Sequence, residues 1–164
     1  MKTKMILTAL ITFTVMLSNA QNFSLQAKSG DVELDASLND INIKAKADLT
    51  LFKKDLAVEF SIGEPKIDKL IIDMKMSPAD AYMTLQIANM TKKEPDVVAT
   101  SYTTNKDKGW GVIAKEMGIK PGSKEFHELK GKAKDKSNKG KGNGKKDTVA
   151  PVKLKENKGK GKKK

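Results

Sequence analysis

Apolar residues that recur at helical or strand spacing stop at Leu129, and the following 35 residues continue no such pattern. Glycine and lysine dominate residues 130–164, which contain 15 lysines against three acidic residues. A segment of this composition cannot bury enough apolar surface to offset the conformational entropy that is lost on folding. The sequence therefore predicts a disordered tail over residues 130–164 and a hydrophobic core built from the residues before it.

The formal net charge of +12 comes from this tail alone, because residues 1–129 contain 17 lysines and 17 acidic residues. Every cation is a lysine, a mobile point charge that lacks the planar fork with which arginine recognises phosphates and bases. The tail also lacks aromatic residues on which bases could stack, so sequence-specific nucleic-acid binding is not expected. We expect it to bind an anionic surface or polymer (lipopolysaccharide, anionic lipid, acidic polysaccharide or DNA) by charge density. The predicted polyanion-binding residues are Lys130, Lys132, Lys134, Lys136, Lys139, Lys141, Lys145, Lys146, Lys153, Lys155, Lys158, Lys160, Lys162, Lys163 and Lys164.

The first 20 residues have the organisation of a cleavable signal peptide. Lys2 and Lys4 precede an uncharged, mainly apolar stretch over residues 5–17, and small residues follow it. This stretch is shorter than the about 20 residues that a helix needs to cross a bilayer. We predict cleavage between Ala20 and Gln21 and an exported protein, periplasmic or secreted. The absence of cysteine excludes disulfides and is more typical of a bacterial exported domain than of a small animal one.

Residues 21–129 then form one small domain, whose first part is ambiguous. Apolar and polar residues alternate over residues 21–40, around Ser29-Gly30-Asp31, which fits a β-hairpin and equally an extended arm packed on the domain. The next stretch, residues 41–60, fits both periods. We favour one helix there because helical spacing includes Phe52 and continues to Phe60.

Four further apolar stripes have recognisable helix starts, and a short helix follows them. Proline occupies the first turn at Pro65 and Pro95, and Ser77-Pro78-Ala79-Asp80 has the residues of a capping box. The stripe that begins at Trp110 ends at Gly118, which favours a left-handed cap, and Ser123 starts the last helix. The predicted fold is mainly α, a compact array of five to six short helices.

We predict that the only tryptophan anchors the core. Trp110 lies on an apolar stripe with Ile113 and Met117, and Phe126 faces inward from the last helix. Gly109 and Gly111 flank the tryptophan, which indicates a close approach of backbone at this point or a tight entry to the helix.

Residues 108–130 read KGWGVIAKEMGIKPGSKEFHELK, and this block resembles one found in an uncharacterised family of small exported bacterial proteins. Two upstream pieces, SLNDIN (residues 37–42) and MSPADAYMTL (residues 76–85), resemble the same family. The resemblance covers about residues 31–130 and does not include the tail. It implies an exported, mainly helical domain, and it supplies no catalytic residue.

Three other functions are weighed against attachment through the tail. Residues 113–119 resemble the start of a helix-turn-helix DNA-binding motif, although the next apolar residues come two positions late. His127 is the only histidine and lacks an evident acid–base partner, so we expect an exposed residue and no enzyme.

Four methionines lie close together in the sequence: Met74, Met76, Met83 and Met90. Thioether sulfur suits Cu(I) handling in an exported protein, but methionine in apolar stripes more commonly fills the core. We therefore expect no cofactor.

Overall fold

The computed structural model describes residues 27–139, and within them the protein is mainly helical and contains no strand. The predicted signal peptide, its cleavage site at Ala20–Gln21 and residues 140–164 lie outside the described residues. The elements in chain order are α1 (Val32–Ala47), α2 (Leu49–Phe60), α3 (Glu64–Asp68), the π-helix η1 (Lys69–Asp73), α4 (Pro78–Thr91), α5 (Pro95–Asn105), the 3-10 helix η2 (Lys106–Lys108), α6 (Trp110–Met117) and α7 (Lys124–Asn138).

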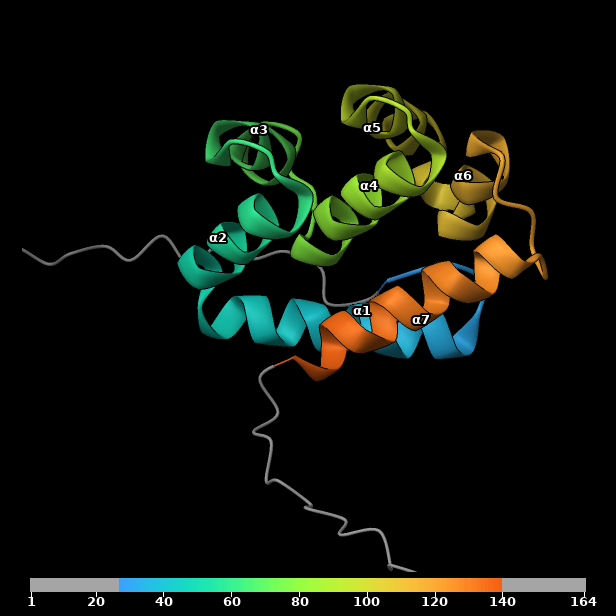
Figure 1. The fold of residues 1–164 in the computed structure, drawn as a ribbon, viewed down its shortest axis with the longest axis horizontal. Coiled ribbons are helices and arrows are strands. Elements are labelled where there is room, and N and C mark those ends of the chain that lie inside the picture. The colour runs from blue at the N-terminus through green and yellow to red at the C-terminus, as the bar shows by residue number, and fades with distance from the viewer. Residues whose placement is uncertain (1–26, 140–164) are drawn as a thin grey trace, which may run out of the picture.

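Helix α4 is the centre of the fold, and the other helices pack around it (Figure 1). Residues 78–88 are all buried except Asp80, which is half-buried. A helix that is buried on every face has no polar stripe, in agreement with the run of apolar and small residues in its sequence. Helices α1 and α7 lie side by side across α4, and α2, α5 and α6 also contact it.

The predicted helix starts are confirmed where a cap specifies them. Ser77 and Asp80 form the capping box: the Asp80 backbone N–H donates to Ser77 Oγ at 3.2 Å, and the Ser77 N–H donates to Asp80 Oδ2 at 3.3 Å. Pro95 opens α5, and Gly118 ends α6 in the left-handed conformation with a φ of 108°. These features depend on residues within one turn of each other, which is why the sequence reveals them.

The prediction of a hairpin is wrong over residues 32–38, which form the first turns of α1. Asp31 caps this helix, because its carboxylate accepts the Leu34 N–H at 2.9 Å. Leu34, Leu38 and Ile41 are buried at spacings of four and three, so the residues that alternate also satisfy a helical period. Residues 27–31 precede the helix without regular structure and pack on α6, as the alternative of an extended arm would have them.

The single helix predicted over residues 41–60 is divided at Asp48. This residue has extended backbone angles, with a φ of −150° and a ψ of 90°, and its carboxylate accepts the Leu51 N–H at 2.9 Å. Aspartate at an N-cap satisfies an amide that would otherwise lack a partner, which stabilises a new helix start. The chain turns at this point, so that α2 directs Phe52 and Leu56 into the core.

The predicted boundary between domain and tail at Lys130 is also wrong, because α7 continues to Asn138. Ala133, Lys136 and Ser137 are buried and continue the inward face of Phe126 and Leu129 at helical spacing. The apolar periodicity of the sequence does not reveal this continuation of α7, because a buried lysine stem and a small alanine take the place of large apolar residues.

A short arm, residues 27–31, closes the domain against the start of α6. The Trp110 N–H donates to the Lys28 carbonyl and the Gly111 N–H donates to the Ser29 carbonyl, both at 2.9 Å. A Cβ added at Gly109 would lie 2.7 Å from the Lys28 oxygen, and one at Gly111 would lie 2.6 Å from the Ser29 oxygen. The close approach of backbone predicted at these glycines is confirmed.

The Gly111→Ala variant is expected to lose about 1–3 kcal/mol of unfolding free energy, because its methyl group collides with backbone that cannot rotate away. Gly131→Ala is the matched control, since it adds the same methyl group at a helical position with nothing within 4 Å. It is expected to gain about 0.5–1 kcal/mol from helix propensity. Urea denaturation of both variants measures the difference, and equal effects would contradict the described approach of the arm.

Candidate functional site

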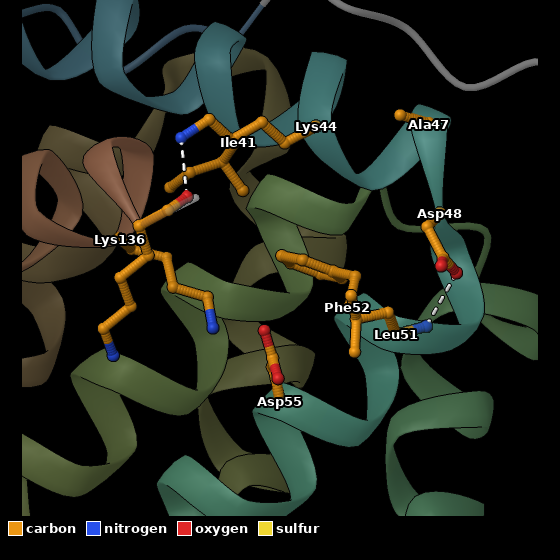
Figure 2. A pocket seen from close by; sticks show the side chains of 9 residues that line it. Ile41, Lys44, Ala47, Asp48, Leu51, Phe52, Asp55 and Lys136 are labelled. Carbon is orange, nitrogen blue, oxygen red and sulfur yellow. Dashed lines mark hydrogen bonds between the residues drawn. The ribbon is translucent and has the colours of Figure 1, made fainter. Parts of the chain in front are cut away.

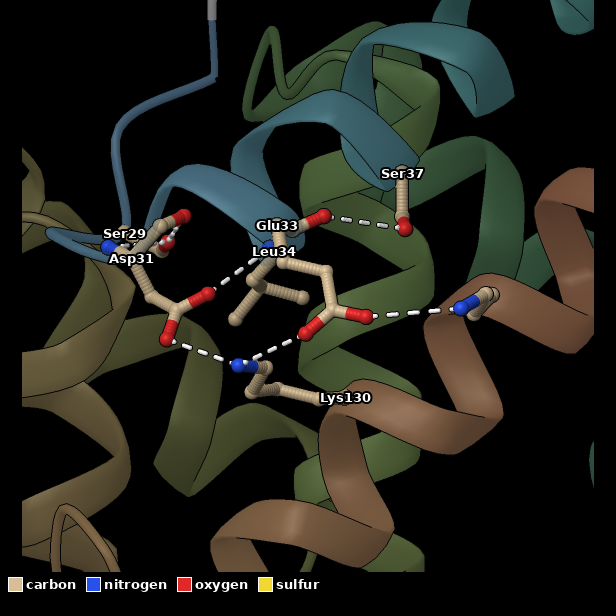
Figure 3. A network of polar contacts seen from close by, with 7 residues as sticks. Ser29, Asp31, Glu33, Leu34, Ser37 and Lys130 are labelled. Atoms are coloured by element: carbon tan, nitrogen blue, oxygen red, sulfur yellow. Dashed lines mark hydrogen bonds and ion pairs between the residues drawn. The ribbon is translucent and has the colours of Figure 1, made fainter.

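The first cluster of ion pairs on the basic helix α7 lies at the start of α1 (Figure 3). The Lys130 ammonium lies 2.9 Å from Asp31 Oδ2 and 3.0 Å from Glu33 Oε2, and Lys134 lies 3.4 Å from Glu33 Oε1. The Leu34 N–H and Lys130 hold the pKa of Asp31 below its usual value, while Lys130 does the same for the pKa of Glu33. Both carboxylates in turn raise the pKa of Lys130, so the cluster stays charged at neutral pH.

A second cluster fixes the end of α7. The Lys136 ammonium lies 2.8 Å from Glu59 Oε2 and 5.4 Å from the centre of the Phe52 ring, and the residue is only 6% exposed. Lys139 lies 3.4 Å from the same Glu59 oxygen. Lys44 of α1 donates to the carbonyl oxygens of Ser137 and, at 2.7 Å, of Lys139. A cation at these last carbonyls satisfies acceptors that the helix leaves without partners.

Four of the fifteen lysines predicted to bind polyanions thus form ion pairs with acidic residues of the domain: Lys130, Lys134, Lys136 and Lys139. Lys132 is exposed, and no ion pair joins it to any residue from 27 to 139. The charge balance follows this division: residues 27–139 contain 20 lysines and 18 acidic residues, whereas residues 140–164 contain ten lysines and two acidic residues. The excess positive charge of the C-terminal region begins after Lys139. The ten remaining predicted lysines lie outside the described residues.

Asp80 forms the centre of a polar cluster that joins α4, α5 and α6. Its Oδ1 accepts the Trp110 indole N–H at 2.7 Å, and its Oδ2 accepts the Tyr102 hydroxyl at 2.8 Å and the Ser77 hydroxyl at 2.7 Å. The Tyr102 and Trp110 rings stack with their centres 5.1 Å apart. Burial and the neighbouring Asp80 charge raise the pKa of Tyr102, so its phenol remains a donor.

The sequence predicted only the capping role of Asp80, and the bond to Trp110 was missed. The two residues are 30 positions apart, so no local spacing could have indicated the contact. A cavity of about 250 Å³ adjoins them, but both oxygens of the carboxylate already have donors. The cluster therefore serves to hold three helices together.

The other predicted residues are distributed over the domain. Trp110, Ile113 and Phe126 are buried and Met117 is half-buried, whereas His127 is exposed. Of the methionines weighed for Cu(I), Met76 and Met83 are buried and the other two, Met74 and Met90, are half-buried against the core. Within residues 27–139 no three His, Cys, Asp or Glu side chains gather closely enough to hold a metal ion. None of the helices between residues 27 and 139 combines the length and the hydrophobicity that spanning a bilayer requires.

Residues 113–119, which resemble the first helix and turn of a helix-turn-helix, lie in α6 and in the turn after it, and residues 118–123 connect α6 to α7. Helix α7 packs most extensively against α1, with which it also forms the first ion-pair cluster. In the DNA-binding motif the second helix lies in the major groove and contacts base edges with its N-terminal residues, while the first helix crosses the DNA backbone.

The buried hydroxyl of Tyr82 has no hydrogen-bond partner in the part of the chain that the structure describes. The ring packs at 6.0 Å from that of Phe60, and burial together with the charges of Glu59 and Asp135 raises the pKa of the phenol. The residue stays neutral and occupies core volume between α2, α4 and α7.

Comparison of this chain with protein-family models, with curated proteins and with solved structures found no match.

Proposed function

We propose that this protein is an exported, non-enzymatic protein that attaches to anionic envelope or extracellular polymers through the basic segment of residues 140–164. The proposal includes cleavage of the signal peptide after Ala20 and a disordered state of the basic segment. In this function the helical domain is the part of the protein that the segment anchors.

The observation that supports the proposal best is the division of charge at Lys139. The lysines of α7 that contact the body are matched by Asp31, Glu33 and Glu59, and residues 27–139 carry a net charge of only +2. Residues 140–164 carry a net charge of +8. A lysine near an anionic membrane contributes about 1 kcal/mol, so partial engagement of ten lysines gives useful affinity.

The experiment compares the mature full-length chain with a chain that ends at Lys139 on immobilised heparin and on vesicles containing anionic lipid. We expect retention of the full-length protein at low salt and loss of retention for the truncated one. Retention should fall steeply as salt rises, because binding releases counterions from the polyanion. A full-length variant in which the ten lysines of residues 140–164 become glutamine is the control for chain length.

The truncation is placed after Lys139 because residues 130–138 belong to α7. A chain cut at Leu129 would lose structure as well as charge, and its behaviour on heparin could not be interpreted. Elution of the Lys139 truncation together with the full-length protein, at every salt concentration, would refute attachment through this segment.

A further inference from the structure

A half-open cavity of about 290 Å³ lies where α1, α2 and the end of α7 meet (Figure 2). The apolar part of its lining comes from Ile41, Ala47, Leu51 and Phe52. Leu51 lines the cavity and is 55% exposed, so it leaves apolar surface there that an occupant could cover. The volume is at the small end of the range for ligand pockets, about 300–1,000 Å³, and suits a few apolar side chains.

The charged groups around this cavity favour an occupant that is apolar and carries lysine beside it. Lys44 already donates to the carbonyls that end α7, and Lys136 is paired with Glu59, so these cations are satisfied. Asp55 also lines the cavity, and no ion pair joins it to any residue of the described range. An anionic ligand would therefore meet cations that already have partners and a carboxylate that repels it, whereas the ammonium group of a lysine could form an ion pair with Asp55.

The chain itself supplies such an occupant. Lys139 lines the cavity and is the last described residue, so the segment that follows begins at the cavity. All the apolar residues of residues 140–164 fall within residues 148–154, which read TVAPVKL, and Lys153 and Lys155 accompany them. Eight residues separate this cluster from Lys139. They span at most about 29 Å when extended, and about 15 Å as a flexible chain.

We propose that residues 148–154 fold back and dock their apolar side chains into the cavity between α1, α2 and the end of α7. Lys153 or Lys155 then lies beside Asp55. Because only eight residues join the segment to Lys139, its effective concentration at the cavity is about millimolar, so even weak contacts keep it docked for much of the time. The C-terminal lysines from Lys158 onward stay free, so docking and polyanion binding are compatible, and the inference does not rest on the proposed function.

The absence of cysteine makes disulfide trapping a clean test, since every disulfide must come from introduced residues. The full chain carries Leu51→Cys with Val152→Cys, and the matched control carries Val58→Cys with Val152→Cys. Leu51 and Val58 are both exposed on α2 and lie two turns apart, but only Leu51 lines the cavity. We expect the Leu51 pair to oxidise within one molecule at least about tenfold faster than the Val58 pair, in proportion to its higher effective concentration.

A third variant adds Val149→Asp to the Leu51 pair. A carboxylate in the docked segment is costly to bury, so the rate is expected to fall to that of the Val58 control. Equal rates for the two pairs, or no effect of Val149→Asp, would overturn the docking. Faster formation of disulfide-linked dimers, with a rate that rises with protein concentration, would overturn it in favour of a second copy. All rates are measured without polyanion, so a negative result here leaves the heparin experiment unaffected.

Discussion

Removal of residues 130–164 is expected to destabilise the domain by about 3–5 kcal/mol, whereas removal of residues 140–164 is expected to cost no more than about 1 kcal/mol, the contribution of the docked segment. The first deletion takes away the last nine residues of α7 and with them the buried side chains of Ala133, Lys136 and Ser137. It also exposes part of α1, including Ile41, and each such residue contributes about 1.5–3 kcal/mol when fully buried.

The same deletion leaves three carboxylates of the body without their lysines. Asp31 and Glu33 lose Lys130, and Glu59 loses Lys136, whose ammonium is almost completely buried. Exposed ion pairs contribute little, so we assign most of the loss to the buried apolar surface. A total stability of about 5–15 kcal/mol is usual for such a domain, so the shorter chain is close to unfolding at room temperature.

Thermal and urea denaturation, followed by circular dichroism and by the fluorescence of Trp110, measure both deletions. We expect the chain that ends at Leu129 to lose at least about 15 °C in Tm or to show no cooperative transition. The unfolding free energy of the chain that ends at Lys139 should lie within about 1 kcal/mol of that of the full-length protein. Equal stability of the two truncated chains would contradict the assignment of residues 130–138 to the folded domain.

The second large effect is expected at Asp80, where alanine should cost about 3–5 kcal/mol of unfolding free energy. Alanine leaves the Trp110 indole N–H and the Tyr102 hydroxyl without their acceptor and abolishes the capping box of α4. A buried donor without a partner costs about 1–3 kcal/mol, and loss of a cap about 1 kcal/mol.

Asp80→Asn is the matched variant, because the amide has the shape of the carboxylate. Its oxygen can still accept the Trp110 N–H, and its NH₂ group can donate to the hydroxyls of Ser77 and Tyr102, which also act as acceptors. We expect a loss of only about 1–2 kcal/mol. Urea denaturation of both variants checks the order, and an alanine variant as stable as the asparagine variant would show that the cluster does not hold the helices together.

The sequence predicted those parts of the fold that depend on residues close together in the chain. The starts of α4 and α5 and the left-handed end of α6 each follow from a cap or a proline within one turn. The division at Asp48 was missed because apolar spacing continues through it, although aspartate is a common N-cap. Whether residues 41–60 form one helix or two depends on how α2 packs on the core, and local spacing does not show this.

Contacts between distant residues account for the rest of what was missed. Lys130 and Asp31 are 99 positions apart, and Asp80 and Trp110 are 30 apart, so neither pair forms a pattern that periodicity could reveal. Composition was misleading as well: residues 130–138 resemble the lysine-rich tail that follows them, yet three of their four lysines form ion pairs with acidic residues at the start of α1 or on α2. The predicted boundary between domain and tail consequently lies nine residues before the end of α7.

The burial of residues 78–88 of α4 on every face has a consequence for how this protein unfolds. Because α1, α2, α5, α6 and α7 all cover α4, detaching any one of them opens the centre of the molecule to water. Partly opened forms should therefore be scarce, and the backbone amides of α4 should exchange with solvent only when the whole domain unfolds. Because the chain contains no cysteine, no disulfide reinforces it, and such all-or-none unfolding leaves proteases no partly opened intermediate to attack.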